Sequence, residues 1–160
     1  MMAPVGLAAV VEAAVRAVCD PEYPDLTIAE LGIFESVRVD GAGGAHIELV
    51  PTVLACPALR TIEQDVVDAA LGAGAASAEV VFLTSPRWSP ARIDATTRAH
   101  LGREYTVAIR GLDGRIICPV CGGREAHQRA AFGPALCRET WWCDDCRNPV
   151  EVVREAVGRP

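Results

Sequence analysis

The hydrophobic and polar positions change their period several times along the chain. Residues 6–18 carry apolar side chains at the three- and four-residue spacing of an amphipathic helix, and residues 57–71 repeat that spacing. Between these segments, residues 32–39 and 45–50 are short apolar runs, which predicts two strands. The glycine-rich run at 40–44 predicts the turn that joins them as a hairpin. The two prolines around Tyr23 predict a rigid loop after the first helix.

The pattern continues past the second helix. Residues 78–83 form an apolar run rich in β-branched side chains and predict a third strand. Residues 90–101 predict a third helix, with Ser89 as its N-cap. Residues 102–117 change to short strands around the Gly-Leu-Asp-Gly turn at 111–114. The order of elements predicts an α/β (α+β) layer of about 100 residues, followed by a smaller unit.

Seven cysteines are present, and five of them fall in the C-terminal part of the chain. Cys118-Pro-Val-Cys121 and Cys143-Asp-Asp-Cys146 are two Cys-x-x-Cys knuckles, each with two thiolates facing the same point. Two such knuckles facing each other form the four-sulfur tetrahedral site of a structural zinc ribbon. An iron–sulfur centre on the same thiolates, or two redox-active pairs, are the competing interpretations. Redox pairs are disfavoured because no thioredoxin-like strand–helix pattern flanks either knuckle. An iron–sulfur centre is disfavoured because the site resembles a small β-ribbon.

Cys137 lies outside both knuckles. It is either a small buried apolar residue beside Trp141 and Trp142 or an additional thiol near the metal. The histidine at position 127 could in principle replace one thiolate, although four cysteines already complete the site.

Cys56 stands where the second predicted strand gives way to the second helix. Pro57 suits the first helical position, which would make Cys56 the N-cap. A thiol at that point feels the positive end of the helix dipole, so we expect a lowered pKa and rapid alkylation. From position alone, a functional thiol and a buried structural one are equally supported.

The composition excludes some classes of partner. The net charge of −6 argues against nucleic acid as the main partner, because phosphate binding needs a basic face. No apolar run approaches the roughly 20 residues of a membrane-spanning helix. The first residues show no basic region ahead of an apolar stretch, so we expect a cytoplasmic protein without a secretion signal.

Several short motifs occur together in a fixed order. In the first part of the chain they are Asp20-Pro21-Glu22-Tyr23-Pro24, Leu31-Gly32, Thr52 with Cys56-Pro57, and Ser85-Pro86 with Trp88. This series resembles the metal–sulfur cluster assembly domain family, which includes SufT-type iron–sulfur maturation factors. The second part adds Cys118-Pro-Val-Cys121-Gly122, Phe132-Gly133 with Cys137, and Cys143-Asp-Asp-Cys146. With this tail the chain is similar to the PaaD family, accessory subunits encoded with the bacterial phenylacetyl-CoA epoxidase complex.

The resemblance implies a fold and a domain division. It implies a small three-stranded mixed sheet with packed helices over residues 1–103, and a zinc-ribbon domain over residues 104–160. It also implies that Cys56 is the functional thiol, supported by loops that carry Asp20, Glu22 and Thr52.

The function that the resemblance implies is iron–sulfur cluster assembly without enzymatic activity of its own. Cys56 would transiently hold iron, sulfide or a cluster for a client iron–sulfur oxidoreductase or epoxidase subunit, together with other assembly proteins. One thiolate cannot hold a cluster, so a homodimer or the client's own cysteines would complete the site. The alternatives are a structural docking subunit of a multicomponent oxygenase without metal transfer, and a direct oxygenase component. The last is disfavoured because the sequence shows no cofactor-binding loop or di-iron ligand pattern.

Overall fold

A computed structural model gives the fold, and it describes residues 6–155. The chain divides into two compact units, Met1–Arg87 and Trp88–Pro160, which are described separately. In the described part, none of the helices combines the length and the apolar character needed to cross a membrane. The domain boundary expected after residue 103 remains a prediction.

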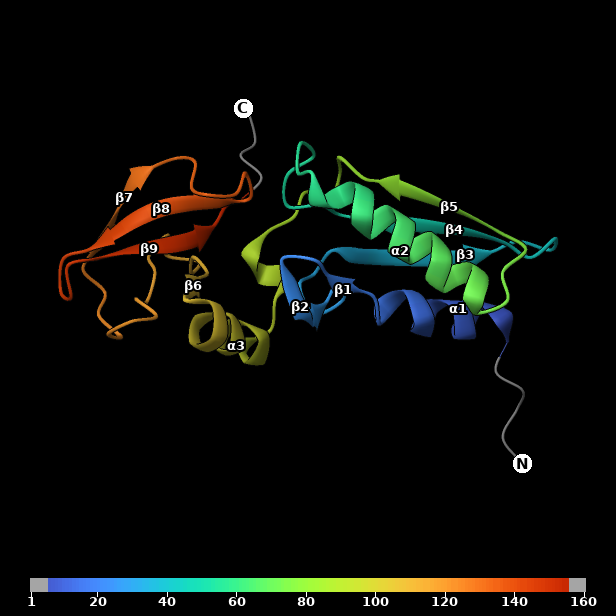
Figure 1. Cartoon of the computed structure of the whole chain (residues 1–160), viewed down its shortest axis with the longest axis horizontal. Helices are drawn as coiled ribbons and strands as arrows, with labels where there is room; N and C mark the ends of the chain where they lie inside the picture. The colour runs from blue at the N-terminus through green and yellow to red at the C-terminus, as the bar shows by residue number, and fades with distance from the viewer. Residues whose placement is uncertain (1–5, 156–160) are drawn as a thin grey trace. The chain divides into compact units, whose positions relative to one another are not determined.

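The described part of the first unit alternates helices and strands (Figure 1). They are α1 (Leu7–Arg16), β1 (Cys19–Asp20), β2 (Tyr23–Thr27), β3 (Phe34–Val39), β4 (Gly44–Leu49), α2 (Ala58–Gly72) and β5 (Ser77–Phe82). The strand order of the main sheet is β3-β4-β5, with β3 antiparallel and β5 parallel to the central β4. The three-stranded mixed sheet with packed helices is therefore confirmed.

The core of this unit lies between the sheet and the two helices. On β4, Ile47 and Leu49 are fully buried, whereas His46 just before them is exposed. Strand alternation places the two apolar side chains on one face. Val15 of α1 and Val66 of α2 are also fully buried and belong to the same core. Burying each such side chain contributes about 1.5–3 kcal/mol.

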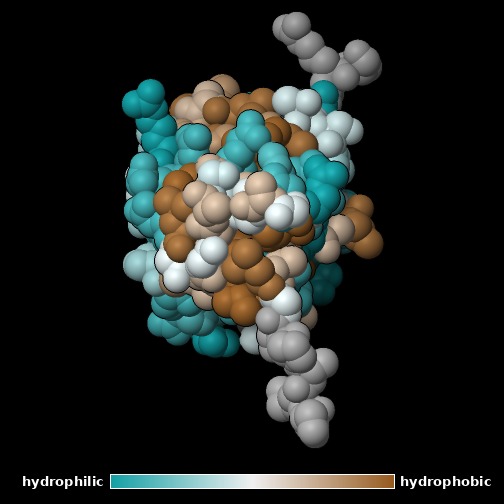
Figure 2. Space-filling model, turned by 90° about the vertical axis from the view of Figure 1, so that its right-hand side faces the viewer, coloured by the Kyte–Doolittle hydropathy of each residue, from teal (hydrophilic) through white to brown (hydrophobic). Residues whose placement is uncertain are grey.

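Some apolar side chains of the helices remain exposed. Figure 2 faces the end of the first unit where α1 begins and α2 ends, and shows hydrophobic patches among polar side chains. Leu7 and Val10 of α1 and Leu71 of α2 are each about 40% exposed. Partly exposed apolar residues are common on protein surfaces.

The prediction of a rigid loop around Tyr23 is wrong. This segment forms strand β2, which pairs antiparallel with β1 through Cys19↔Thr27 and Asp20↔Tyr23. Tyr23 and Leu26 are buried, so tertiary packing outweighs the turn preference of the proline between them.

The second unit is built on a different sheet. Its elements are a 3₁₀ turn η1 (Pro90–Arg92), α3 (Ala95–Tyr105), β6 (Val107–Ala108), β7 (Ala126–Ala130), β8 (Arg138–Cys143) and β9 (Asn148–Val153). The strand order is β6-β9-β8-β7, and β6 runs parallel to β9. Along β8, Glu139, Trp141 and Cys143 are buried, and the residues that alternate with them are half-buried.

The third helix differs from its prediction at both ends. Ser89 makes no capping hydrogen bond and precedes only the 3₁₀ turn. The N-cap is Asp94, whose carboxylate accepts a hydrogen bond of 2.7 Å from the backbone N–H of Thr97. The helix then continues to Tyr105 and ends at Thr106, which has a left-handed backbone. Asp94 takes the cap because its carboxylate satisfies one of the unpaired amides of the first turn.

The prediction of a β-hairpin around residues 111–114 is also wrong. A tight turn exists, closed by hydrogen bonds from Gly111 N to Arg115 O and from Gly114 N to Gly111 O. Its two flanks do not pair with each other as strands in the described structure, because β6 before the turn pairs with β9 instead.

Candidate metal centre and thiol site

The four cysteines of the two knuckles meet in the second unit. Their sulfur atoms all lie within 4.8 Å of one another. The Sγ atoms of Cys118 and Cys146 are 3.8 Å apart, and those of Cys121 and Cys143 are 3.7 Å apart. Sulfurs bound about 2.3 Å from a tetrahedral zinc would be separated by about 3.8 Å. The donor set and its spacing therefore fit a tetrahedral metal ion, and the four cysteines form a metal-binding cluster.

The backbone of each knuckle supports the cluster. Gly122 has a φ of +75°, and its N–H donates to the carbonyl of Cys118 at 2.8 Å. The N–H of Gly123 donates to Cys121 Sγ at 3.3 Å. In the second knuckle the N–H of Arg147 donates to the carbonyl of Cys143 at 2.9 Å. These bonds orient the thiols before a metal binds.

The acidic residues of the second knuckle hold it against the first, which the sequence did not reveal. A side chain at Gly123 would place its Cβ in collision with Asp145, so glycine suits the position beside that carboxylate. Asp145 Oδ2 also accepts a hydrogen bond of 3.2 Å from Glu125 N. The N–H of Asp144 donates to the carbonyl of Glu125 at 2.7 Å. The two adjacent aspartates inside the second knuckle are the sequence feature that could have indicated these contacts.

Two thiols of the cluster differ widely in pKa. The Gly123 amide lowers the pKa of Cys121, but burial and the neighbouring cysteines outweigh it and raise that pKa to about 12. Asn148 is the main group that lowers the pKa of Cys146, to about 7. Cys146 therefore loses its proton before Cys121. A bound metal cation favours loss of the remaining protons, because only thiolates act as ligands.

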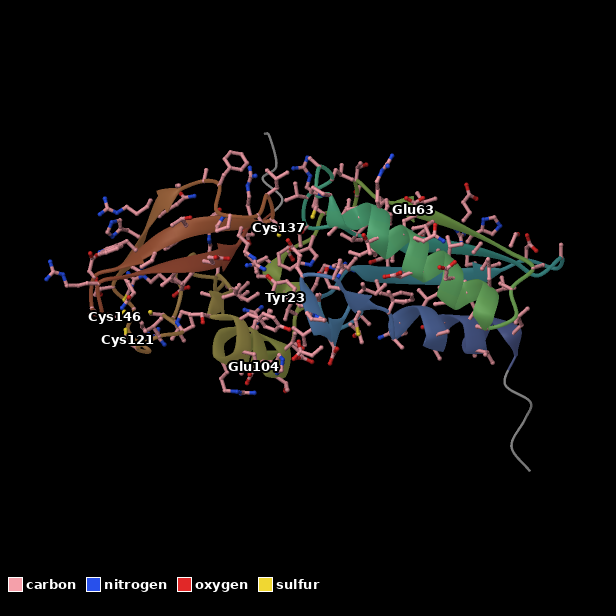
Figure 3. All side chains as sticks on the ribbon, viewed as in Figure 1. Tyr23, Glu63, Glu104, Cys121, Cys137 and Cys146 are labelled. Carbon is pink, nitrogen blue, oxygen red and sulfur yellow. The ribbon has the colours of Figure 1, made fainter. Side chains whose placement is uncertain are left out.

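The other two candidate ligands are not among the four residues whose donor atoms converge. His127 is exposed, and its Nδ1 is 3.0 Å from Asp144 Oδ2. Cys137 is buried and precedes β8, whereas Cys143 ends that strand. Figure 3 shows Cys121 and Cys146 together at one end of the ribbon and Cys137 at the other. An extended strand of this length separates the two ends by about 20 Å.

The first unit holds the predicted functional thiol. Cys56 is half-buried and lies on the loop that leads into α2. The helix begins at Ala58 and Pro57 is its N-cap, so Cys56 precedes the cap by one residue rather than forming it. Its carbonyl accepts a hydrogen bond of 3.2 Å from Leu59 N. Thr52 lies earlier in the same loop and is also half-buried, and its supporting role remains a prediction.

The surroundings of Cys56 act against the expected acidity. Burial is the largest cause and raises the pKa of the thiol, and the carboxylates of Glu22 and Asp20 raise it further. Hydrogen bonds from the Ala58 and Leu59 amides oppose this and are outweighed. The expectation of a lowered pKa was therefore wrong, because burial and two acidic residues from another part of the chain outweigh the helix terminus.

Asp20 and Glu22 are brought to the thiol by the β1–β2 turn. Asp20 is only 7% exposed, and its Oδ1 accepts a hydrogen bond of 2.7 Å from Glu22 N. This bond fixes the turn that carries both carboxylates. Two of the three residues expected to support Cys56 therefore interact with it electrostatically.

This environment predicts that the Cys56 thiol is alkylated slowly at neutral pH. Because the thiolate is the nucleophile, alkylation of Cys56 by iodoacetamide should reach half its maximal rate above the ordinary thiol pKa of about 8.5. Glu22→Gln should lower that midpoint by removing one repelling charge. Rates measured from pH ~6 to ~11 by mass spectrometry, in a Cys19→Ala background, would check this. A midpoint below about 8.5, or no change with Glu22→Gln, would contradict the electrostatic description.

Comparisons with known proteins agree with both units. Residues 8–81 match the family described as iron-sulfur cluster assembly protein. Residues 103–154 match the PaaD zinc beta ribbon domain. The crystal structure of a domain of unknown function, DUF59, from Bacillus anthracis is similar with a TM-score of 0.53 and 27% sequence identity. The match covers 60% of this chain and 92% of that one.

A curated relative covers both parts. A protein of Escherichia coli (strain K12), named as a subunit of 1,2-phenylacetyl-CoA epoxidase, is 29% identical over 142 residues. The match covers 84% of this chain and 85% of the relative. The chain thus combines a segment that matches iron–sulfur cluster assembly proteins with a four-cysteine segment that matches a zinc ribbon. In both of its matched parts, the chain is similar to proteins of the PaaD type.

Proposed function

We propose that the chain is a non-enzymatic maturation factor that supplies iron, or an iron–sulfur cluster, to a subunit of a multicomponent epoxidase acting on phenylacetyl-CoA or a similar aromatic acyl-CoA. The observation that carries the proposal is the half-buried thiol of Cys56 beside two carboxylates, in a domain that matches iron–sulfur cluster assembly proteins. The relative's name supplies the epoxidase.

The charges around Cys56 favour iron over sulfide as its cargo. A raised pKa keeps the thiol protonated and makes it a weak nucleophile toward sulfur compounds. A ferrous ion reverses this balance, because its charge is attracted by Asp20 and Glu22 and favours loss of the thiol proton. The site then releases iron when the proton returns, which suits a transient carrier.

Cys56 would not hold its cargo alone. A cluster needs about four ligands, and one thiolate with two carboxylates offers fewer suitable donors. Cysteines of the client, of another assembly protein or of a second copy of this chain would complete the coordination during transfer.

The ribbon has a separate role in this proposal. Its four thiolates hold one zinc ion as a closed structural site, with no position left for a substrate. Zinc there stabilises the second unit and presents its surface to partner subunits. We place the protein in the cytoplasm, where epoxidase subunits and iron–sulfur assembly proteins would meet it.

Complementation tests the pathway. In an Escherichia coli strain that lacks the relative described above, expression of this chain should restore epoxidation of phenylacetyl-CoA. The control is the same strain carrying the empty expression vector. No activity with the full chain, despite normal expression and co-purification with the other epoxidase subunits, would overturn the proposed pathway.

A further inference from the structure

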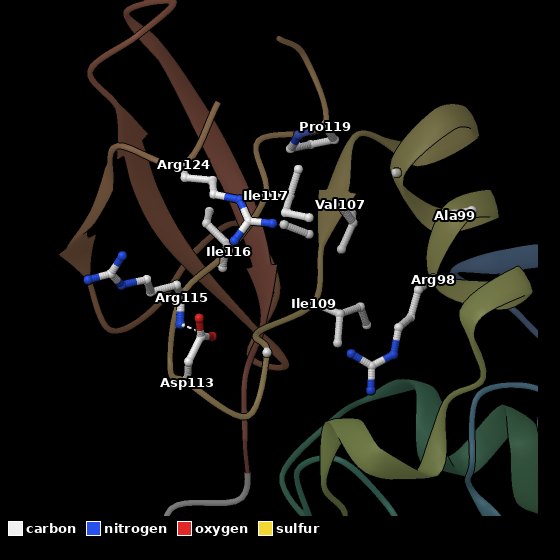
Figure 4. A pocket seen from close by; sticks show the side chains of 13 residues that line it. Arg98, Ala99, Val107, Ile109, Asp113, Arg115, Ile116, Ile117, Pro119 and Arg124 are labelled. Carbon is white, nitrogen blue, oxygen red and sulfur yellow. Dashed lines mark hydrogen bonds between the residues drawn. The ribbon is translucent and has the colours of Figure 1, made fainter. Parts of the chain in front are cut away.

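A cavity of about 460 Å³ lies within the second unit and takes no part in the metal cluster. It is bounded on one side by α3 and on the other by the segment from Val107 to Ile117, as Figure 4 shows. Pro119 of the first knuckle also lines it. Its volume falls within the range of small-molecule sites in proteins.

The wall of the cavity is mostly apolar. Val107, Ile109 and Ile117 line it from one side, and Ala99 lines it from α3. Ile117 is 57% exposed although it is a large aliphatic residue, so part of this wall is accessible to solvent. A ligand that covers it would gain free energy from burying apolar surface.

The charged groups on the same wall are mostly positive. Arg98, Arg115 and Arg124 line the cavity with a single acidic residue, Asp113, so that cations exceed anions by two. This excess contrasts with the chain as a whole, which has a net charge of −6. Asp113 accepts a hydrogen bond of 3.0 Å from the backbone N–H of Arg115, which fixes its position in the turn.

The guanidinium groups keep donors available. Arg98 is anchored by hydrogen bonds from its side chain to the carbonyls of Ile93 and Pro90, which leave its charge uncompensated. Among the ion pairs within residues 6–155, none involves Arg98 or Arg124. By contrast, Arg110 nearby pairs with buried Glu139 at 2.5 Å. Figure 4 shows the Arg124 guanidinium beside Ile117 and that of Arg98 beside Ile109.

We propose that this cavity binds a small organic carboxylate. The apolar body of the ligand, an aromatic ring or a short aliphatic chain, would lie between α3 and the 107–117 segment. Its carboxylate would pair with Arg124, since the planar fork of a guanidinium matches a carboxylate in two-pronged hydrogen bonds. This site is independent of iron transfer at Cys56 and of zinc in the ribbon.

A matched pair of probes tests the proposal. The zinc-loaded, ¹⁵N-labelled full chain would be titrated with 4-phenylbutyrate and with its uncharged analogue 4-phenylbutanamide. We expect amide shifts concentrated at the residues that line the cavity, and an affinity for the carboxylate about tenfold higher than for the amide. Shifts scattered over the surface, or equal affinity for the two probes, would overturn the proposal.

Variants test separately the contribution of the positive charge and that of the apolar cavity to binding. Arg124→Gln should weaken 4-phenylbutyrate about tenfold and leave 4-phenylbutanamide unchanged. Arg129→Gln is the control, since Arg129 lies on β7 over the ring of Trp142 and outside the cavity. Ala99→Leu should fill the cavity and weaken both probes without breaking the helix, because leucine is a good helix former. Equal affinities for Arg124→Gln and Arg129→Gln, or undiminished binding to Ala99→Leu, would contradict the site.

Discussion

Replacing Cys56 with Ala should abolish iron delivery while leaving the protein folded. Cys56 is half-buried in a loop and lies before the N-cap of α2, so alanine removes a thiol without breaking the helix. Co-expression of the epoxidase subunits with the Cys56→Ala variant should therefore yield a client that has lost most of its iron and its electron-transfer activity. Iron analysis of the purified client measures this effect.

The control for this experiment is another cysteine in the same unit. Cys19 is exposed at the start of β1, and Cys19→Ala should support full loading of the client. A client with full iron content in the presence of Cys56→Ala would favour the docking alternative, in which surface contacts suffice. Loss of iron with unchanged client binding would favour transfer.

Replacing Cys143 with Ala should remove the metal and unfold the ribbon. Cys143 is fully buried and ends β8, so its loss takes away one of four ligands and leaves a gap beneath the cluster. Structural zinc contributes on the order of 10 kcal/mol to folding of small metal-binding units. We expect near-complete loss of zinc and loss of the near-ultraviolet signal from Trp141 and Trp142.

Cys137→Ala is the matched control for this variant. Cys137 is buried in the same unit and lies outside the metal-binding cluster. It should keep one zinc ion per chain and most of the aromatic signal, although it leaves a small cavity. Retention of one zinc per chain by Cys143→Ala would contradict the four-cysteine site.

The sequence predicts local features of this protein well. The knuckles are readable because two ligands three positions apart meet through one tight turn, and the four sulfurs converge as the spacing indicated. The helices α1 and α2 follow from their apolar periodicity. The mixed sheet came from the family resemblance, because which strands pair depends on contacts distant in sequence.

The features that the sequence missed depend on tertiary neighbours. The pKa of Cys56 is raised by burial and by Glu22 and Asp20, which come from a distant part of the chain. The sequence predicts Ser89 as the cap of the third helix, whereas Asp94 accepts the hydrogen bond from the first turn of α3. The cavity beside α3 has no sequence motif, because its wall combines a helix, a turn and a knuckle that only folding brings together.

Direct transfer of labelled iron tests the central claim most sharply. The purified protein would be loaded with ⁵⁵Fe²⁺ and mixed with the iron-free client, in the presence of a chelator that captures free iron. Delivery through Cys56 predicts that the wild-type protein and Cys19→Ala pass label to the client, whereas Cys56→Ala passes none above the chelator background. Equal labelling of the client by Cys56→Ala would contradict delivery through this thiol.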